Sequence, residues 1–222
     1  MNITNLYRAR FKKSAQKRKN QIWSVLCRNF FHKFIKKEMS CLEIACGYGE
    51  FINNISASKK YAIDLNQDSS KYLNKDIKFI QKNVLDLTLN DLDEKVDVVF
   101  ISNFLEHLSD KKSLEKLLVI IKKILKDDGL LLIMGPNLKY LGGTYWDFYD
   151  HELGLTHLSL AEVLNNFDYE ILLNINKFLP FTVESRLPTH PFLVYIYLKI
   201  PFVWKLLGKQ FFIFSKNKKW IF

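Results

Sequence analysis

Short apolar runs recur between residues 41 and 134, and polar or amphipathic segments separate them. The runs with the length of β-strands are 41–45, 60–64, 77–81, 96–102 and 130–134. The segments with helical spacing between them are 49–57, 68–73 and 110–126. The continuous apolar run at 98–101 is typical of a strand buried on both faces. This alternation predicts the α/β class with a doubly wound, mostly parallel sheet.

The alternation becomes less regular after residue 134. We expect a helix over 159–166, with Ser159 as its N-cap and Glu162 completing a capping box. Further strands are expected at 169–175 and 210–215, where apolar residues return. The chain therefore predicts seven strands in all.

The length of chain between the last two expected strands is unusual. A hairpin needs only a few residues, whereas about thirty stand there, so we interpret 177–208 as a helical insertion. Its apolar stretch 192–207 predicts a helix that is too short to span a bilayer and that Pro201 interrupts. Trp204 and the flanking lysines suit a membrane interface. A helix pair that covers the active site or forms a dimer contact is the alternative interpretation.

Near the N-terminus, residues 5–37 lack Gly and Pro and predict a helix. Apolar side chains recur there at steps of three and four residues: Trp23, Leu26, Phe30 and Phe34. We expect this stripe to dock against a domain, while the lysines beside it leave an interfacial role open.

The net charge of the chain is concentrated in the same N-terminal region. The 222 residues include 33 Lys and Arg against 23 Asp and Glu, a net charge of +10. Residues 1–38 hold eleven of the basic residues and one acidic residue, so the remaining 22 of each sign balance. We therefore expect a basic helical arm over 1–38 and one domain over 39–222. Such an arm suits nucleic acid, anionic lipid or a phosphorylated substrate, although a solvated helix explains it as well.

Cysteine use and the N-terminal composition bear on the compartment. The three cysteines show neither metal spacing nor a disulfide framework, which suits a reducing environment. The charged N-terminus lacks the apolar run of a signal peptide. We expect a cytoplasmic protein, with peripheral contact to an anionic membrane at its inner face as an extension of that expectation.

The segment 41–51 carries the most specific signal in the chain. An apolar run containing Glu43 stops at a turn with Gly47 and Gly49, and the next strand-like run ends at Asp64. Glycines let the backbone approach a ligand, and amides at a helix start favour an anionic or zwitterionic group. A carboxylate at the end of the second strand suits a ribose. Together these residues predict a nucleoside-cofactor pocket.

Four further segments, taken together with this one, distinguish between possible cofactors. A nicotinamide fingerprint is incomplete, because Ile52 stands where its third glycine belongs. The full set is 43–51, 63–65, 83–87, 96–108 with its Leu-Glu-His-Leu ending, and 125–133. In this order and spacing the segments resemble the motifs of class I S-adenosylmethionine-dependent methyltransferases, over residues 41 to about 176. The resemblance implies a Rossmann-like, seven-stranded sheet with an antiparallel last strand, and S-adenosyl-L-methionine as cofactor.

The resemblance also implies roles in holding the methionine and ribose parts of the cofactor. Gly47 and Gly49 would let the backbone approach the methionine part. Glu43 would order the turn and reach the amino group, directly or through water. Asp64 would accept hydrogen bonds from both ribose hydroxyls.

Roles for the adenine side follow from the same resemblance. Asp86 would meet the adenine amino group, and Leu65 and Leu85 would lie against the ring faces. Asn103 would close the pocket beside the sulfonium.

Candidates for the acceptor side follow the fifth strand, in the aromatic segment 145–152 and its continuation. His151 and His157 are candidate general bases for a hydroxyl, because imidazole titrates near neutral pH. Asp147 stands among them as a third candidate. For His157, bracing the helix that follows is an alternative role.

A metal site is a further alternative for the same segment. It would combine Asp147, Asp150, His151 and His157, but their spacing fits no dedicated metal motif, so we expect no metal. His107 is interpreted as a structural residue at the start of a helix.

The sequence thus predicts an S-adenosylmethionine-dependent methyltransferase that O-methylates a glycan, a lipid-linked molecule or another small-molecule acceptor. An RNA methyltransferase that uses the basic arm is one alternative. Against it, 102–105 lacks the Asn/Asp-Pro-Pro-aromatic signature of amino-directed nucleic-acid enzymes. A non-catalytic binding protein with the same fold is the other alternative. The oligomeric state is not predicted.

Overall fold

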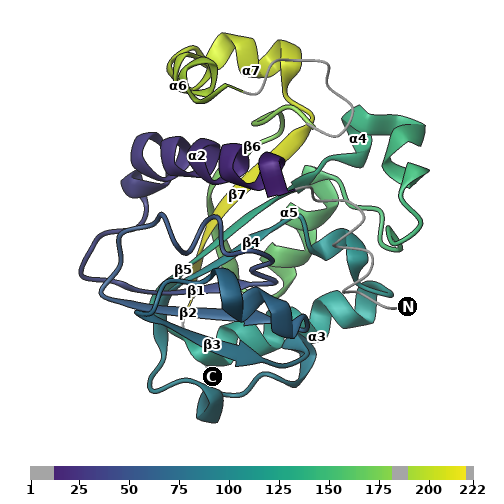
Figure 1. Cartoon of the computed structure of the whole chain (residues 1–222). Coiled ribbons are helices and arrows are strands. Elements are labelled where there is room, and N and C mark those ends of the chain that lie inside the picture. Colours follow the sequence, from purple (N-terminus) through teal and green to yellow (C-terminus); the bar gives the residue numbers. More distant parts are fainter. Residues whose placement is uncertain (1–12, 182–189, 219–222) are drawn as a thin grey trace.

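A computed structural model describes residues 13–181 and 190–218 (Figure 1). At its centre is a seven-stranded sheet in the order β3-β2-β1-β4-β5-β7-β6. The strands are β1 (Ser40–Ile44), β2 (Lys59–Asp64), β3 (Ile77–Gln81), β4 (Val96–Ser102), β5 (Leu125–Pro136), β6 (Tyr169–Ile175) and β7 (Gln210–Asn217). β7 pairs antiparallel with β5 and β6, whereas β1 to β5 pair in parallel. The predicted Rossmann-like sheet with an antiparallel last strand is confirmed.

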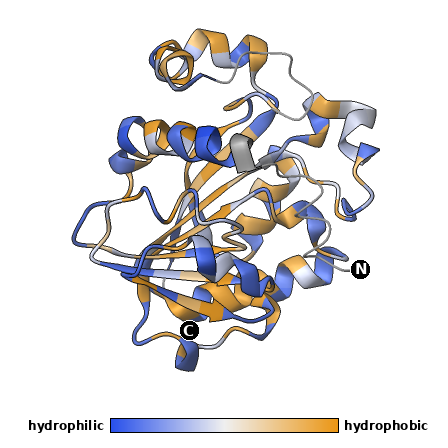
Figure 2. Ribbon diagram, viewed as in Figure 1, coloured by the Kyte–Doolittle hydropathy of each residue, from blue (hydrophilic) through white to orange (hydrophobic). Residues whose placement is uncertain are grey.

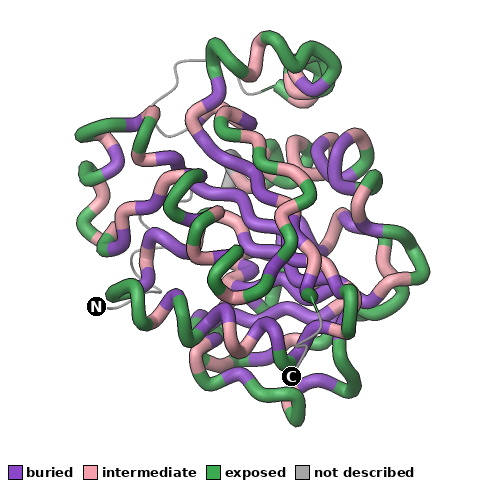
Figure 3. Tube along the Cα trace, turned by 180° about the vertical axis from the view of Figure 1, so that it is seen from behind, coloured by how far each residue is buried: buried purple, intermediate pink, exposed green. Residues whose placement is uncertain are grey.

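Helices cover both faces of this sheet. They are α2 (Lys13–Asn29), α3 (Lys111–Ile124), α4 (Leu138–Leu141), α5 (His157–Asn166), α6 (Pro191–Lys199) and α7 (Pro201–Leu207). Successive strand residues point to opposite faces, so Leu42 and Ile44 pack toward α3 and α5, whereas Cys41 and Phe100 pack toward α2. α6 packs beside α2 on the second face (Figure 1). Burial therefore follows the strands, and the outer loops and helices are exposed (Figure 3).

The N-terminal helix docks on the sheet through its apolar stripe, as predicted. Leu26 and Phe30 are buried, and the Trp23 ring lies 6.0 Å from the Phe100 ring. The predicted extent of this helix to residue 37 is wrong, since α2 ends at Asn29. There the side-chain amide of Asn29 donates to the carbonyl of Val25 at 2.8 Å and competes with the backbone ladder. Residues 5–12 of the predicted helix lie outside the described residues.

The helix predicted over 49–57 is absent, and successive turns take its place. The amide of Ile52 donates to the Glu43 carboxylate at 3.0 Å instead of to a helical carbonyl. The side chain of Asn53 is also drawn away, because it donates to the carbonyl of Tyr72 at 2.9 Å. Two helical bonds remain, from the backbone amide of Asn53 to the carbonyl of Gly49 and from that of Ile55 to the carbonyl of Phe51, each at 2.9 Å. The contacts to β1 and to the loop after β2 accompany turns that do not join into a continuous helix.

The helix predicted over 110–126 ends earlier than expected, at Ile124. Asp110 caps its start by accepting from the amide of Ser113 at 2.7 Å. The segment 127–129 does not end the helix but forms an irregularity within β5, where Asp128 has a φ of 64°. The left-handed conformation explains why a polar Asp-Asp-Gly sequence can interrupt the pairing with β4.

The start of α5 also differs from the prediction. Thr156, and not Ser159, is the N-cap, because its side chain accepts from the amide of Ser159 at 3.1 Å. The Ser159 side chain in turn accepts from the amide of Thr156 at 3.0 Å. The capping box therefore lies three residues before the predicted one and does not use Glu162.

The apolar stretch predicted over 192–207 forms two helices, with the break at Pro201 that the ring would cause. Tyr197 ties α6 to the domain, because its hydroxyl donates to the carbonyl of Phe178 at 2.6 Å. Trp204 of α7 donates to the carbonyl of Tyr197 at 2.7 Å. Among the described residues, no helix has the length and apolar character needed to cross a membrane.

Candidate functional site

The turn after β1 forms the first part of the site. Ala45, Gly47 and Gly49 all have positive φ angles, of 53°, 55° and 70°. A Cβ atom at Gly49 would lie 2.3 Å from a methyl group of Leu73, so a side chain there requires movement as well as strain. The chain is thus held close against the segment that follows β2.

Asp64 joins this turn to the end of β2. Its carboxylate accepts from the amides of Gly47 and Asn66, each at 2.8 Å. Gly47 and Asp64 therefore lie side by side at the carboxyl edge of the sheet, where the sequence places them. Burial raises the pKa of Asp64, while these backbone donors oppose the rise. Each carboxylate oxygen has a second lone pair, so further donors can be accepted there.

Three carboxylates gather around the turn. Glu43 and Glu50 are buried with Asp64, and burial raises the pKa of Glu43 well above its usual range. The charges of Glu50 and Asp64 raise that pKa further. Lys19 of α2 lies 3.0 Å from Glu50 and links the basic arm to this cluster. Buried carboxylates are costly without positive partners, so the cluster suits a ligand that carries positive charge.

The remaining sequence-predicted cofactor residues lie around the same edge. Leu65 follows β2 and is 52% exposed. Asp86 follows β3 and lies, exposed, 3.9 Å from Lys116. Asn103 follows β4, has a φ of 49°, and donates its amide to the carbonyl of Met134 at 2.9 Å. The ends of β1, β2, β3 and β4 thus contribute all eight residues that were predicted to meet the cofactor, including Leu85 in the turn after β3.

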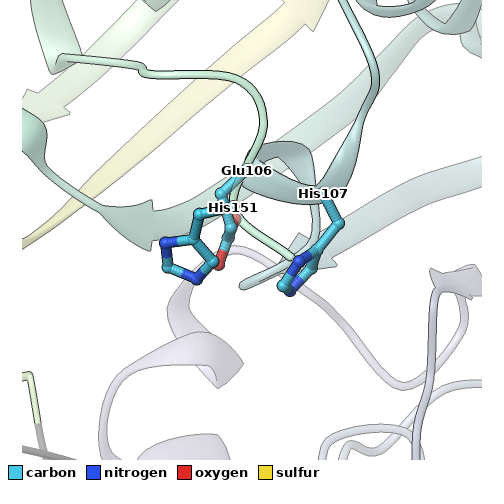
Figure 4. A group of neighbouring side chains, drawn as sticks. All are labelled: Glu106, His107 and His151. Atoms are coloured by element: carbon cyan, nitrogen blue, oxygen red, sulfur yellow. The ribbon is translucent and has the colours of Figure 1, made fainter. Parts of the chain in front are cut away.

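A second group of side chains lies at the ends of β4 and β5 and is shown in Figure 4. Glu106, His107 and His151 each offer one ligand atom, and these atoms all lie within 4.8 Å of one another (Figure 4). Glu106 is 3% exposed, and burial raises its pKa to about 7. Its Oε2 would lie 3.8 Å from a Cβ at Gly135, which places the carboxylate beside the end of β5.

Backbone carbonyls orient both histidines. Nδ1 of His107 lies 2.8 Å from the carbonyl oxygen of Asp150, and Nδ1 of His151 lies 2.7 Å from that of Tyr145. A carbonyl only accepts, so each Nδ1 carries the proton and each Nε2 carries the lone pair. The rings are 5.2 Å apart.

The two loops that carry this group are joined through the backbone. The carbonyl of Glu106 accepts from the amides of Glu152 and Leu153 at 2.8 and 3.1 Å. These bonds bring His151 next to a residue that stands 45 positions earlier. Glu106 is not among the residues predicted from the sequence. The interpretation of His107 as the start of a helix was wrong, because α3 begins only at Lys111. The signal available in the sequence was the adjacent Glu-His pair directly after a strand.

The other two acceptor-side candidates have different surroundings. His157 is buried at the start of α5, and its Nδ1 lies 3.0 Å from the side-chain amide of Asn137. Burial lowers the pKa of His157 first, and the charge of Lys139 lowers it further. These contacts are those of a neutral, bracing imidazole. Asp147 is exposed at the end of a short 3-10 turn.

Comparison with known proteins gives a family match and a fold match. A family model described as "Methyltransferase domain" matches residues 15–174. No curated protein matches the sequence. Among solved structures, a SAM-dependent methyltransferase from Archaeoglobus fulgidus has a TM-score of 0.61 at 19% identity, over 89% of this chain and 94% of the other.

Two further structures are similar. The plantazolicin methyltransferase BpumL, solved with a triazolic desmethyl analogue and SAH, has a TM-score of 0.62 at 16% identity, over 98% of this chain and 90% of the other. A putative methyltransferase of Haloferax volcanii, solved with the Trm112 methyltransferase activator, has a TM-score of 0.65 at 11% identity, over 92% and 93%. At these identities the likeness concerns the fold.

Proposed function

The chain belongs to the methyltransferase domain family and is an S-adenosylmethionine-dependent methyltransferase; we propose that it O-methylates an amphipathic glycan, lipid-linked or other small-molecule acceptor. S-adenosylmethionine supplies an electrophilic methyl group on a sulfonium, and the enzyme contributes binding, alignment and control of the acceptor proton. The observation that carries the acceptor proposal is the exposed apolar surface of α6 and α7, which lies on the same side of the sheet as the basic helix α2.

The β1–β2 edge fits the cofactor by charge and by backbone geometry. At neutral pH the cofactor has a positive sulfonium and a positive amino group, and such a ligand would offset the burial that raises the pKa of Glu43 beside Glu50 and Asp64. We assign Glu43 to the amino group and Asp64 to the ribose hydroxyls. Gly47 and Gly49 provide the backbone approach to the methionine part.

The residues farther along this edge complete the cofactor assignment. Leu65, being half exposed at the end of β2, has apolar surface to place against the adenine ring. Asp86 is assigned to the adenine amino group, and its carboxylate is only loosely paired with Lys116 at 3.9 Å. Asn103, in its left-handed conformation, is assigned to the sulfonium side of the pocket.

The acceptor hydroxyl is assigned to the β4–β5 edge. His151 presents an imidazole whose lone pair is on Nε2, which is the tautomer needed to take a proton or to coordinate a cation. His157 is assigned a positioning role through Asn137, because its contacts hold the start of α5. Asp147 is exposed near the same loop and is assigned to the rim that meets the acceptor.

The surface of α6 and α7 suits an amphipathic acceptor or the membrane that contains it. Of the 15 exposed large hydrophobic residues among those described, eight lie between Phe192 and Leu207. Phe202 and Leu206 are 67% and 66% exposed. Figure 2 shows mostly apolar positions along these two helices, and Lys199 and Lys205 stand near their ends. Contiguous exposed apolar area of this kind marks an interaction surface.

Basic residues are exposed on the helix that packs beside α6. Lys17 and Arg18 of α2 are exposed, and α2 packs beside α6 (Figure 1). Aromatic and apolar side chains beside lysines are typical of segments that rest on an anionic membrane. We propose that the arm over 1–38 and the insertion over 177–208 attach the domain over 39–222 to such a surface.

The test combines membrane binding with methyl transfer. Phe202→Ser with Leu206→Ser should reduce sedimentation with anionic vesicles at low salt, whereas Leu172→Ser, an exposed apolar control on β6, should not. Radiolabelled methyl transfer to a cell-envelope lipid extract should depend on the same pair. Equal vesicle binding by all three proteins would reject the membrane proposal.

The RNA alternative rests on the same basic arm and makes a different prediction. If RNA binds through phosphate contacts, the logarithm of its binding constant should fall steeply and linearly with the logarithm of the salt concentration. RNA binding would also be insensitive to Phe202→Ser and Leu206→Ser, because these residues are apolar. Methyl transfer to RNA with that salt dependence would replace the lipid-linked proposal.

A further inference from the structure

The group formed by Glu106, His107 and His151 has the composition of a metal-binding site. Two imidazoles and one carboxylate are a donor set that suits divalent first-row transition metals. Their ligand atoms lie within 4.8 Å of one another. Metal–ligand bonds of about 2.1 Å put neighbouring ligand atoms of a tetrahedral site about 3.4 Å apart, so a cation would draw the most distant pair together by about 1.4 Å at most. This set shares only His151 with the four residues weighed in the sequence analysis.

The surroundings of the two histidines also match those of metal ligands. Histidines that bind metals usually donate their second ring nitrogen to a carbonyl or carboxylate, which fixes the ring and the tautomer. His107 does so toward the carbonyl of Asp150 at 2.8 Å, and His151 toward that of Tyr145 at 2.7 Å. The carboxylate of Asp150 lies 3.4 Å from the same nitrogen of His107. Both rings are therefore held with the lone pair on Nε2.

Glu106 adds a carboxyl group that is almost wholly buried, at 3% exposure. Among the described residues, no lysine or arginine forms an ion pair with it. A buried carboxylate is costly unless a cation or donors compensate it. The side chain of His107 is about one-third exposed, at 31%, so the group is reachable from solvent.

We propose that Glu106, His107 and His151 bind one divalent transition-metal cation that holds the acceptor hydroxyl. Three protein ligands leave coordination positions open for an oxygen ligand. The site lies beside Gly135 at the end of β5, next to the β4 loop that carries Asn103. It is therefore on the side of the sheet edge assigned to the acceptor.

The cation would act on the acceptor as a Lewis acid, and this part rests on the proposed function. Coordination lowers the pKa of a bound hydroxyl, as it does for metal-bound water. The O–H bond then breaks with its electron pair left on oxygen, and the proton passes to solvent water. No oxidation or reduction is involved. His151 would act through the metal and not as the base itself.

The first experiment measures the cation alone. The purified full-length protein is stripped with a chelator and titrated with Zn²⁺, Mn²⁺ and Mg²⁺ by calorimetry. We expect one site per chain that binds Zn²⁺ and Mn²⁺ more tightly than Mg²⁺, because imidazole suits the transition metals. Co²⁺ should give a visible absorption band that reports nitrogen and oxygen ligands.

Variants decide whether these residues form the site. Glu106→Gln and His107→Gln should each weaken Zn²⁺ binding by at least about tenfold. His32→Ala is the matched control, because it removes an exposed histidine outside the group. Binding of S-adenosylhomocysteine should be unchanged in all three, which also verifies folding. If a variant loses that binding, Glu106→Asp and His107→Asn take its place. The proposal is overturned if folded variants at Glu106 and at His107 bind Zn²⁺ with the same affinity as the wild-type protein.

Methyl-transfer assays with and without chelator distinguish failure of the metal proposal from failure of the proposed function. If cation binding behaves as expected but the enzyme methylates its acceptor equally well in chelator, the role of the metal in catalysis is rejected. If no hydroxyl acceptor is methylated, the proposed function fails while the cation titration stands.

Discussion

The β1–β2 end and the β4–β5 end of the site obtain their chemistry in different ways. At the β1–β2 end, backbone amides of Gly47 and Ile52 meet carboxylates that stand 17 and 9 residues away. At the β4–β5 end, side chains of Glu106 and His151 meet across 45 residues. The first end is a charged cradle for a cofactor, and the second is a set of donors for an acceptor. Binding and acceptor chemistry should therefore be separable by mutation.

The largest effect that tests this separation is expected at His151. His151→Ala should lower kcat by roughly 10²- to 10⁴-fold, the range for loss of proton-transfer or metal-assisted activation. Affinity for S-adenosylhomocysteine should not change, because His151 contacts Tyr145 and the β4 loop, at the end of the site assigned to the acceptor. Turnover and calorimetry on the same preparation check both halves. Wild-type turnover would remove His151 from the acceptor site.

The reverse pattern is expected for Asp64. Asp64→Ala should weaken S-adenosylhomocysteine binding at least about tenfold, since hydrogen bonds to a charged group contribute roughly 1.5–3 kcal/mol. It also removes the acceptor for the amides of Gly47 and Asn66, so a lower melting temperature is expected. Zn²⁺ affinity at the other end should remain. Unchanged cofactor affinity would contradict the ribose assignment, and a joint loss of both affinities would mean that the two ends are one unit.

Glu43 offers a pH test of the charged cradle. Burial raises its pKa, so the folded protein binds this proton more tightly than the unfolded chain. The free energy of unfolding without cofactor should therefore fall as pH rises above the ordinary pKa of about 4.3, by at most about 1.4 kcal/mol per pH unit. Glu43→Gln should flatten this decline. Urea unfolding between pH 5 and 8 measures it, and parallel curves for both proteins would show that Glu43 does not carry the effect.

The same contrast explains what could be predicted from the sequence. Strand positions, the doubly wound sheet and the β1–β2 residues follow from apolar runs, glycines and carboxylates close together in the chain. The predictions that were wrong concern segments in which a side chain accepts a hydrogen bond from a backbone amide. One example is the Glu43 carboxylate, which accepts from the amide of Ile52. The predicted N-cap of α5 was wrong for a similar reason, because the extended conformation of Thr156 makes that residue the N-cap. Spacing alone does not contain these choices.

The group around Glu106 was missed for a different physical reason. Its assembly depends on two amides, of Glu152 and Leu153, that bond to the Glu106 carbonyl. That pairing joins two irregular loops, for which no periodic pattern sets a register. A sequence can offer the residues, but only the folded backbone brings them together.

A glycine pair separates strain from contact at the β1 turn. Gly49 and Gly142 have φ angles of 70° and 57°, but only Gly49 has neighbours within 4 Å of an added Cβ. Gly142→Ala should cost about 1–3 kcal/mol from the backbone alone, because φ of 57° with ψ of −136° is a conformation that residues with a Cβ rarely adopt. Gly49→Ala should cost more, because Leu73 must also move, and it should weaken cofactor binding. Thermal unfolding measures the loss of stability in both variants. Equal losses would mean that the Leu73 side chain moves aside without a measurable free-energy cost.

The smallest expected effect is at the outer rim of the cofactor end. Asp86 is exposed and loosely paired with Lys116, so it offers a hydrogen bond to adenine that competes with water. Asp86→Ala should weaken S-adenosylhomocysteine binding only about two- to tenfold, which corresponds to roughly 0.5–1.5 kcal/mol. Asp91→Ala, which removes a nearby carboxylate paired with Lys82, is the control and should leave that affinity unchanged. The loss should also vanish when the ligand lacks the adenine amino group, because the variant and the wild type then make the same contacts. A loss that persists with such a ligand would assign Asp86 to the loop and not to adenine.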